Sequence, residues 1–213
     1  MHVLLAGAHG QVGQHAARLL GESDHDARGM VRDEGQASEV EALGIDPVVA
    51  DLTREDEVRE AVEGCDAAVF AAGSGGDDVW GVDRDGAVNL VDACEDAGAD
   101  RFVMLSAIGA DTPEAGPDAL EEYLEAKSEA DDYLRESDLT YTVVRPGELT
   151  NEPGTGRVRT GADLDATSGD IPRPDVAAVL VETLGAEATH GETFELLSGE
   201  VPIAEAVADP FGE

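Results

Sequence analysis

Lysine is almost absent from this chain. Lys127 is the only lysine among 213 residues, and 12 arginines bring the basic total to 13, against 48 acidic residues. The formal net charge is therefore −35 at pH 7. A field of this sign excludes nucleic acids and anionic membranes as partners, because both carry negative charge.

Aromatic residues, cysteines and long apolar runs are also scarce. Aromatics make up 4% of the chain, and few aromatics with an acidic excess can indicate disorder, but here regular apolar segments run throughout and predict a folded protein. The two cysteines, Cys65 and Cys94, lack metal-ligand spacing, so we expect reduced structural thiols and no metal site. The sequence has neither a charged-then-apolar leader nor a membrane-length apolar run, which predicts a soluble cytoplasmic protein.

The acidic excess resembles that of cytosolic proteins from extreme halophiles, in which molar salt screens the repulsion. We predict that folding of this chain needs high salt, because self-repulsion at a net charge of −35 opposes the compact state. Thermal melts in increasing KCl should show a rising melting temperature. A melting temperature that stays flat from low to molar salt would contradict this prediction.

Residues 2–20 read as a strand, a glycine-rich turn and a helix. His2 to Ala6 form a short apolar run, and Gly7, Gly10 and Gly13 follow as G-x-x-G-x-x-G before apolar residues at helical spacing. The first glycine permits a sharp turn, the second lets a phosphate approach the backbone, and the third lets the helix pack closely. Free N–H groups at the helix start would face the anion. An ordinary tight turn is the alternative, but motif and context together favour a dinucleotide site.

Strands and helices alternate along the rest of the chain. This rhythm predicts an α/β fold with a doubly wound parallel sheet, in the strand order 3-2-1-4-5-6. We expect one domain over residues 1–213, in which residues 151–213 cover the substrate side and residues 151–170 form a loop over the pocket. The expected strands are 25–31, 47–50, 66–71, 101–105, 140–144 and 193–197, and the expected helices are 36–43, 54–62, 79–97, 118–136 and 174–184.

Several residues at strand ends are candidates for holding the cofactor. Arg32 follows the second strand, where the adenosine ribose is read, and an arginine there suits a 2′-phosphate, which favours NADP over NAD. Asp33 beside it could oppose this preference. Asp51 and Leu52 could flank the adenine, although Asp51 could equally belong to the cap of the next helix. Small residues after the fourth strand would let a ribose pack against the backbone: Ala71, Ala72 and Gly73.

Tyr123 and Lys127 form the candidate catalytic pair. They lie four residues apart on an expected helix and therefore project from one face. An ammonium beside a phenol favours the phenolate, which can exchange a proton with a substrate oxygen. Ser106, at the end of the fifth strand, could bond the same oxygen. Such pairs also occur by chance on helices, but the near-elimination of lysine favours a functional role for Lys127.

With these motifs the chain resembles the short-chain dehydrogenase/reductase superfamily, most closely its small atypical NmrA-like or epimerase-like members. The resemblance implies a Rossmann NAD(P)-binding fold in which Tyr123 is the acid/base, Lys127 holds the nicotinamide ribose and Ser106 steadies the substrate oxygen. It also implies that Asn89 belongs to a proton relay. His9 stands where these relatives usually carry Thr. The carriers of the resemblance, besides Ser106 and the Tyr-Lys pair, are Gly7, His9, Gly10, Gln11, Val12, Gly13, Val31, Arg32, Asp51, Leu52, Ala71, Ala72, Gly73, Arg145 and the expected nicotinamide contacts Pro146 and Gly147.

Three hypotheses follow from these residues. The first is an NADP-dependent oxidoreductase that transfers a hydride to or from a small carbonyl or alcohol. The second is a nucleotide-sugar epimerase or dehydratase, although such relatives carry a longer C-terminal substrate portion than residues 151–213. The third is a cofactor-binding redox sensor without catalysis, although such sensors typically lack the Tyr123 and Lys127 pair.

Overall fold

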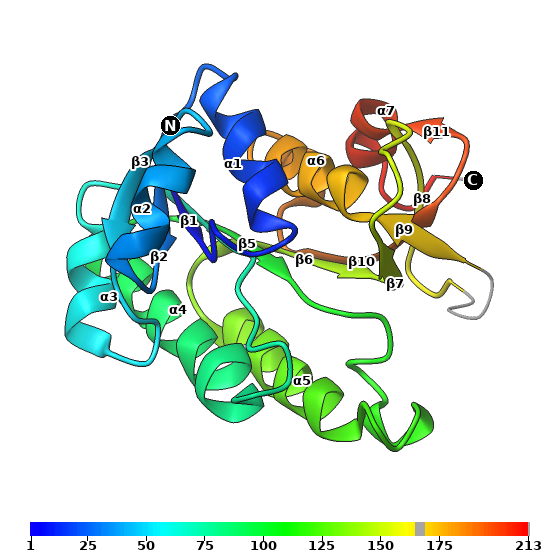
Figure 1. The fold of residues 1–213 in the computed structure, drawn as a ribbon. Helices are drawn as coiled ribbons and strands as arrows, with labels where there is room; N and C mark the ends of the chain where they lie inside the picture. The colour runs from blue at the N-terminus through cyan, green and yellow to red at the C-terminus, as the bar shows by residue number, and fades with distance from the viewer. Residues whose placement is uncertain (165–168, 213) are drawn as a thin grey trace.

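A nine-stranded sheet runs through the computed structural model, which describes residues 1–164 and 169–212, and helices cover both faces of the sheet (Figure 1). The strand order is β11-β8-β10-β6-β5-β4-β1-β2-β3. The strands are β1 (His2–Ala6), β2 (Asp26–Val31), β3 (Asp46–Val49), β4 (Ala67–Phe70), β5 (Arg101–Leu105), β6 (Thr140–Pro146), β8 (Arg157–Gly161), β10 (Glu192–Ser198) and β11 (Val201–Pro202). The helices are α1 (Gly13–Gly21), α2 (Glu34–Glu41), α3 (Glu55–Val62), α4 (Gly86–Ala97), α5 (Glu121–Glu136), α6 (Arg173–Thr183) and α7 (Ile203–Ala208).

Six parallel strands form the larger part of the sheet. Their order, β3-β2-β1-β4-β5-β6, is the predicted one and confirms the doubly wound Rossmann fold. β1 lies at the centre, with Leu5 paired to Gly29 of β2 on one side and to Val69 of β4 on the other. The winding reverses at this strand, and ligands of doubly wound sheets bind at the carboxyl ends of the strands beside such a reversal.

The other edge of the sheet goes beyond the prediction. β10 adds in parallel to β6, and it covers the expected late strand at residues 193–197. β8 pairs antiparallel with β10, and β11 pairs antiparallel with β8, so the sheet is mostly rather than wholly parallel. The expectation of a loop over residues 151–170 is wrong for residues 157–161, because pairing with β10 satisfies the backbone of β8; residues 165–168 lie outside the described part. A separate small sheet pairs β7 (Glu148–Thr150) with β9 (Asp170–Pro172).

Two helices differ most from their expected bounds. The segment predicted as one helix over residues 79–97 is a π-helix, η1 (Val79–Asp85), followed by α4. The Asp78 side chain accepts a hydrogen bond from the Gly81 backbone N–H at the start of this segment. The helix expected over residues 118–136 begins three residues later, at Glu121. π-Helical segments often mark functional sites, and Asp83 of this one contacts Ser74 in the loop after β4.

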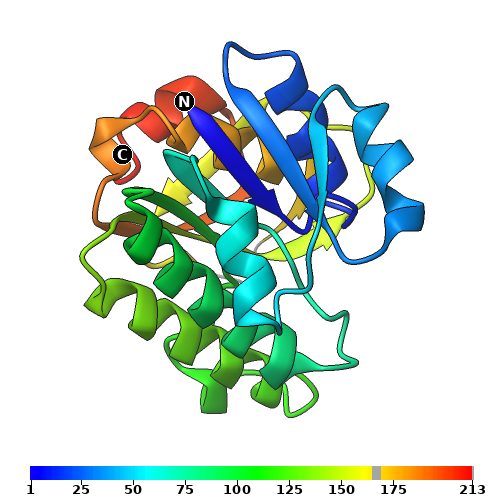
Figure 2. The same ribbon diagram turned by 90° about the vertical axis from the view of Figure 1, so that its left-hand side faces the viewer.

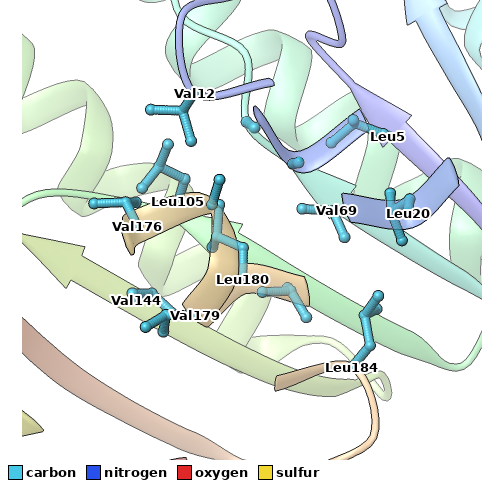
Figure 3. Packing of buried hydrophobic residues seen from close by; sticks show 14 of the residues in the cluster. Leu5, Val12, Leu20, Val69, Leu105, Val144, Val176, Val179, Leu180 and Leu184 are labelled. Carbon is cyan, nitrogen blue, oxygen red and sulfur yellow. The ribbon is translucent and has the colours of Figure 1, made fainter. Parts of the chain in front are cut away.

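Each face of the sheet buries its own apolar cluster. α1, α2, α6 and α7 cover one face, and α3, α4 and α5 cover the other, as the turned view in Figure 2 also shows. On the first face, Val12 and Leu20 of the α1 segment pack with Leu180 of α6 over Leu5 and Leu105 of the strands (Figure 3). These contacts hold α1, and with it the glycine turn, rigidly against the carboxyl edge of the sheet.

Candidate functional site

The glycine turn between β1 and α1 leaves no room for side chains. Gly7 has φ +84°, and a Cβ there would lie 2.6 Å from the Cα of Ala72. A Cβ on Gly13 would lie 2.0 Å from the Gly7 carbonyl oxygen. Gly10 donates its N–H to the same oxygen over 2.9 Å. The third glycine therefore lets the start of α1 pack against the turn itself.

The start of α1 presents unpaired donors. Within the described part of the chain, the backbone N–H groups of Gln11 and Val12 have no hydrogen-bond acceptor. They stand at the positive end of the α1 dipole, with Val12 at the N-cap position. Unpaired donors at a helix start beside a glycine turn fit a phosphate group.

A cavity of about 210 Å³ opens against this turn, and we name it the nucleotide cavity. It lies at the carboxyl ends of β1, β2 and β4. Gln36 and Val82, which the sequence did not single out, also line it, as does Ser74 of the loop after β4. The structure brings nine of the predicted cofactor residues to its walls: Gly7, His9, Gly10, Arg32, Asp51, Leu52, Ala71, Ala72 and Gly73.

The charged residues of the nucleotide cavity have defined partners. Asp33, which could have opposed a phosphate, caps α2 by accepting the Gly35 N–H over 2.7 Å. Asp51 accepts from the backbone N–H and the hydroxyl of Thr53, and the pKa of Asp51 is lowered, mainly by that backbone hydrogen bond and also by the charge of Arg32. Asp51 thus closes the turn before α3 as well as lining the cavity. Arg32 is the one basic residue, besides the histidine at position 9, among the described lining residues.

His9 lies at the rim of the same cavity. Its Nε2 is 3.1 Å from the Glu39 carboxylate of α2, and its backbone carbonyl accepts from the Gln14 side chain. This residue therefore links the glycine turn to α2. Asn89, expected in a proton relay, donates instead to the Leu52 carbonyl over 2.8 Å and so fixes the loop that lines the cavity.

A second cavity, of about 1200 Å³, lies farther along the same edge of the sheet, beyond β5 and β6; we name it the large cavity. Four predicted site residues line it: Ser106, Tyr123, Pro146 and Gly147. The start of α5 contributes Tyr123, and β7, β10 and the segment 162–164 also line the cavity. The structure thus places 13 of the predicted site residues in two cavities along one edge, whereas Gln11, Val12, Gly13 and Lys127 line neither.

Lys127 lines neither cavity. Only 2% of this residue is exposed, and its ammonium donates to the Leu105 carbonyl over 3.2 Å. It also lies 3.4 Å from the Asp83 carboxylate of η1, which is equally buried. The ammonium stands 5.7 Å from the centre of the Tyr123 ring and 5.3 Å from that of Phe70, so it faces the tyrosine as a cation over an aromatic ring.

Asp83 connects this ion pair to the nucleotide cavity. Its second oxygen, Oδ2, accepts from both the backbone N–H and the hydroxyl of Ser74, over 3.0 and 2.8 Å. Ser74 follows Gly73 in the loop after β4, so Lys127 holds that loop through Asp83. The role of Asp83 could not be predicted from the sequence, because acidic residues are abundant throughout the chain.

Ser106 belongs to a second buried network. Its hydroxyl donates to Asp131 Oδ2 over 2.8 Å, and Arg145 donates to the same oxygen through two nitrogens, each at 3.0 Å. Asp131 is fully buried, and its Oδ1 has no partner within the described residues. Burial raises the pKa of Asp131, while the charges of Arg145 and Arg135 and the Ser106 hydrogen bond oppose that rise. The Ser106 oxygen is therefore left to accept, rather than donate, toward the large cavity.

The remaining residues of interest lie away from both cavities. Cys65 and Cys94 are buried free thiols, and burial raises the pKa of each. Among the described helices, none has the length and apolar character needed to span a membrane.

Comparisons with known proteins agree with this geometry. A family model described as NAD(P)H-binding matches residues 7–187. A Bacillus subtilis (strain 168) protein named "Uncharacterized sugar epimerase YhfK" is 44% identical over 213 residues, covering 97% of this chain and 99% of the relative. Sanguinarine reductase of Eschscholzia californica is 28% identical, covering 97% and 92%. A solved structure from Bacillus halodurans, named among NAD-dependent epimerase/dehydratases, is 40% identical with a TM-score of 0.93, covering 97% of this chain and 98% of its own.

Proposed function

Because this chain belongs to the NAD(P)H-binding family, we propose that it is an NADP-dependent oxidoreductase that transfers a hydride to or from a small carbonyl or alcohol. The observation that carries the proposal is the position of two cavities along one carboxyl edge of the sheet, one at the glycine turn and one at Ser106 and Tyr123. This is the edge at which doubly wound folds bind dinucleotides and their substrates. A relative named as a reductase supports the same chemistry.

Different groups of residues would bind the different parts of the cofactor. Gly7 to Gly13 would hold the pyrophosphate, since the turn excludes any Cβ and leaves the N–H groups of Gln11 and Val12 unpaired. Arg32 would bind the 2′-phosphate, and Asp51 with Leu52 would flank the adenine. Ala71 to Gly73 would pack against a ribose, and Pro146 with Gly147 would line the nicotinamide. When bound, the cofactor supplies or accepts the hydride.

Three residues would act on the substrate oxygen or support the residue that does. Tyr123 lines the large cavity and would exchange a proton with that oxygen. Ser106, oriented by its hydrogen bond to Asp131, would steady that oxygen in the alcohol form by accepting a hydrogen bond from the substrate hydroxyl. Lys127 would support both Tyr123, whose ring its ammonium faces, and the cofactor loop, through Asp83 and Ser74.

We also propose that residues 1–213 act as one domain in which the segment after β6 covers the substrate. Glu148, Asp163 and Glu195 of that segment line the large cavity together with Tyr123. The name of the Bacillus subtilis relative favours a nucleotide-sugar epimerase as the second candidate. Incubation of the protein with NADPH and a panel of carbonyl compounds separates the two, because an oxidoreductase consumes NADPH in proportion to product and an epimerase does not.

Cofactor choice gives a specific prediction at Arg32. The variant Arg32→Ala should lose about ten- to a hundredfold in NADPH affinity, because a guanidinium that forks onto a phosphate contributes roughly 1.5–3 kcal/mol. NADH affinity should change little, and the parent should prefer NADPH. Titration of both cofactors at high KCl measures this.

Arg54→Ala is the matched control for that titration. Arg54 also acts on Asp51 but pairs with Glu57, and it does not line the nucleotide cavity. The control should keep the NADPH preference. Equal loss of both cofactors in Arg32→Ala would mean that Arg32 serves the fold or the adenine, and a parent preference for NADH would refute the NADP assignment.

A further inference from the structure

The walls of the large cavity carry acidic residues and no basic ones. Asp111 comes from the loop after β5, Glu148 from β7, Asp163 from the segment after β8 and Glu195 from β10. Lysine, arginine and histidine are absent from its described lining. The apolar part of the lining includes Ile108, Leu120, Leu124, Leu149 and Leu164. The cavity therefore combines an apolar surface with negative charge from four separate segments.

Glu195 is the buried member of these four acids. Only 7% of it is exposed, and one of its carboxylate oxygens accepts from the Leu164 backbone N–H. Burial raises the pKa of Glu195, and the charges of Asp111 and Asp163 raise it further, whereas Arg145 lowers it. A carboxylate thus faces the cavity among other carboxylates.

Arg145 and Arg173 lie near this cavity but are not among its lining residues. Arg145 donates twice to the buried Asp131, and its other terminal nitrogen is 3.4 Å from Asp111. Arg173 of α6 donates to the Leu149 carbonyl and to the Asn151 side chain. Both arginines are therefore already engaged by other groups of the protein.

The two cavities on this edge consequently prefer opposite charges. The nucleotide cavity offers Arg32 and unpaired N–H groups, which suit phosphates. An anion in the large cavity would meet carboxylates on an apolar surface, where charge repulsion is stronger than in water. A cation or an uncharged apolar group would not meet this penalty.

We infer that the large cavity selects substrates with an apolar body and no anionic group, and that a positive charge on the substrate strengthens binding. This inference relies on the proposed function for the role of the large cavity as the substrate site. It disfavours nucleotide sugars, whose diphosphate is negative, although a relative is named as a sugar epimerase. It makes Glu195 a specificity-determining residue.

Three tricyclic probes of matched size test this inference: N-methylacridinium (cation), acridine (neutral) and acridine-9-carboxylate (anion). Their Kd values are measured by fluorescence titration, with and without saturating NADP+, at the lowest KCl that keeps the protein folded, because salt screens charge. The oxidised cofactor is used because NADPH would transfer a hydride to the acridinium cation. The parent should bind the cation at least about tenfold more tightly than the anion. UDP-glucose should not displace the bound cation from protein saturated with NADP+.

Glu195→Gln keeps the shape of the side chain and its acceptor for Leu164, and it should reduce the cation-to-anion ratio about fivefold. Asp163→Asn, at an exposed position, should reduce the cation-to-anion ratio as well. This variant tests the inference if Glu195→Gln does not fold. Glu60→Gln on α3 removes the same charge from an exposed site outside both cavities, so its ratio should equal the parent's.

Equal affinity of the parent for cation and anion would overturn the inference, as would an unchanged ratio in both cavity variants. Because the readout is binding, it does not depend on turnover. A parent that prefers the cation but neither binds nor oxidises NADPH would contradict the proposed function and leave the charge selection standing. A parent that reduces carbonyls but binds the anion equally well would contradict the charge selection alone.

Discussion

Replacing Tyr123 by phenylalanine should lower kcat about 10²- to 10⁴-fold, while the affinity for NADPH stays close to that of the parent. The hydroxyl of Tyr123 is the proposed proton donor or acceptor in the large cavity, so its loss removes an interaction with the reacting oxygen and little ground-state binding. Steady-state kinetics on any carbonyl compound that the parent reduces, with a parallel NADPH titration, give both quantities.

Tyr133→Phe provides the matched control on the same helix. The Tyr133 hydroxyl donates to Asp92 over 2.6 Å, which raises the pKa of Tyr133 to about 12, and this residue lies outside the large cavity. The control should therefore keep the parent kcat. Full activity in Tyr123→Phe on a working substrate would show that the acid/base assignment is wrong.

Replacing Lys127 by methionine should destabilise the fold by about 3–5 kcal/mol, because it leaves the Asp83 carboxylate buried without its cation. This loss is a large part of the roughly 5–15 kcal/mol that typically stabilises a domain. The variant should also lose turnover and cofactor affinity together, since Lys127 supports both Tyr123 and the loop at Ser74. Unfolding in urea at high KCl, followed by kinetics below the midpoint, measures the two effects separately.

A double-mutant cycle isolates the ion pair. Asp83→Asn leaves the ammonium of Lys127 buried without its carboxylate, so it too should be strongly destabilising. The double variant should be more stable than the sum of the two single losses predicts. An exposed ion pair contributes at most about 1 kcal/mol to stability. If the free energy of unfolding of Lys127→Met lies within that amount of the parent's, the result contradicts the buried pairing.

The N-terminal half of the fold could be predicted because its signals are local. The run from His2 to Leu20 contains a strand, a turn and a helix, and each glycine has a conformational or steric reason that a single sequence reveals. Alternation of strands and helices then limits the strand order through the handedness of the crossovers. The edge formed by β8 and β11 could not be predicted in the same way. Val158 is the one buried residue of β8, and a single buried position gives no periodic pattern in the sequence.

The candidate site could be predicted only in part, because its interactions join distant residues. Tyr123 and Lys127 were found from their spacing, but the partner of Lys127 is Asp83, 44 positions earlier in the sequence and on another helix. Asp131 lies four residues after Lys127, and this spacing alone places both side chains on the same helix face. With 48 acidic residues in the chain, nothing marked these two as buried.

Transfer of isotope tests the central claim most directly. The parent protein is incubated at high KCl with NADPH carrying deuterium at the transferable C4 position and with a panel of uncharged and cationic carbonyl compounds, and the products are examined by mass spectrometry. The account predicts an alcohol product that carries the deuterium, formed by the parent and by Tyr133→Phe but strongly reduced in Tyr123→Phe. NADPH that remains unconsumed with every compound, from a protein that binds it, would contradict the account.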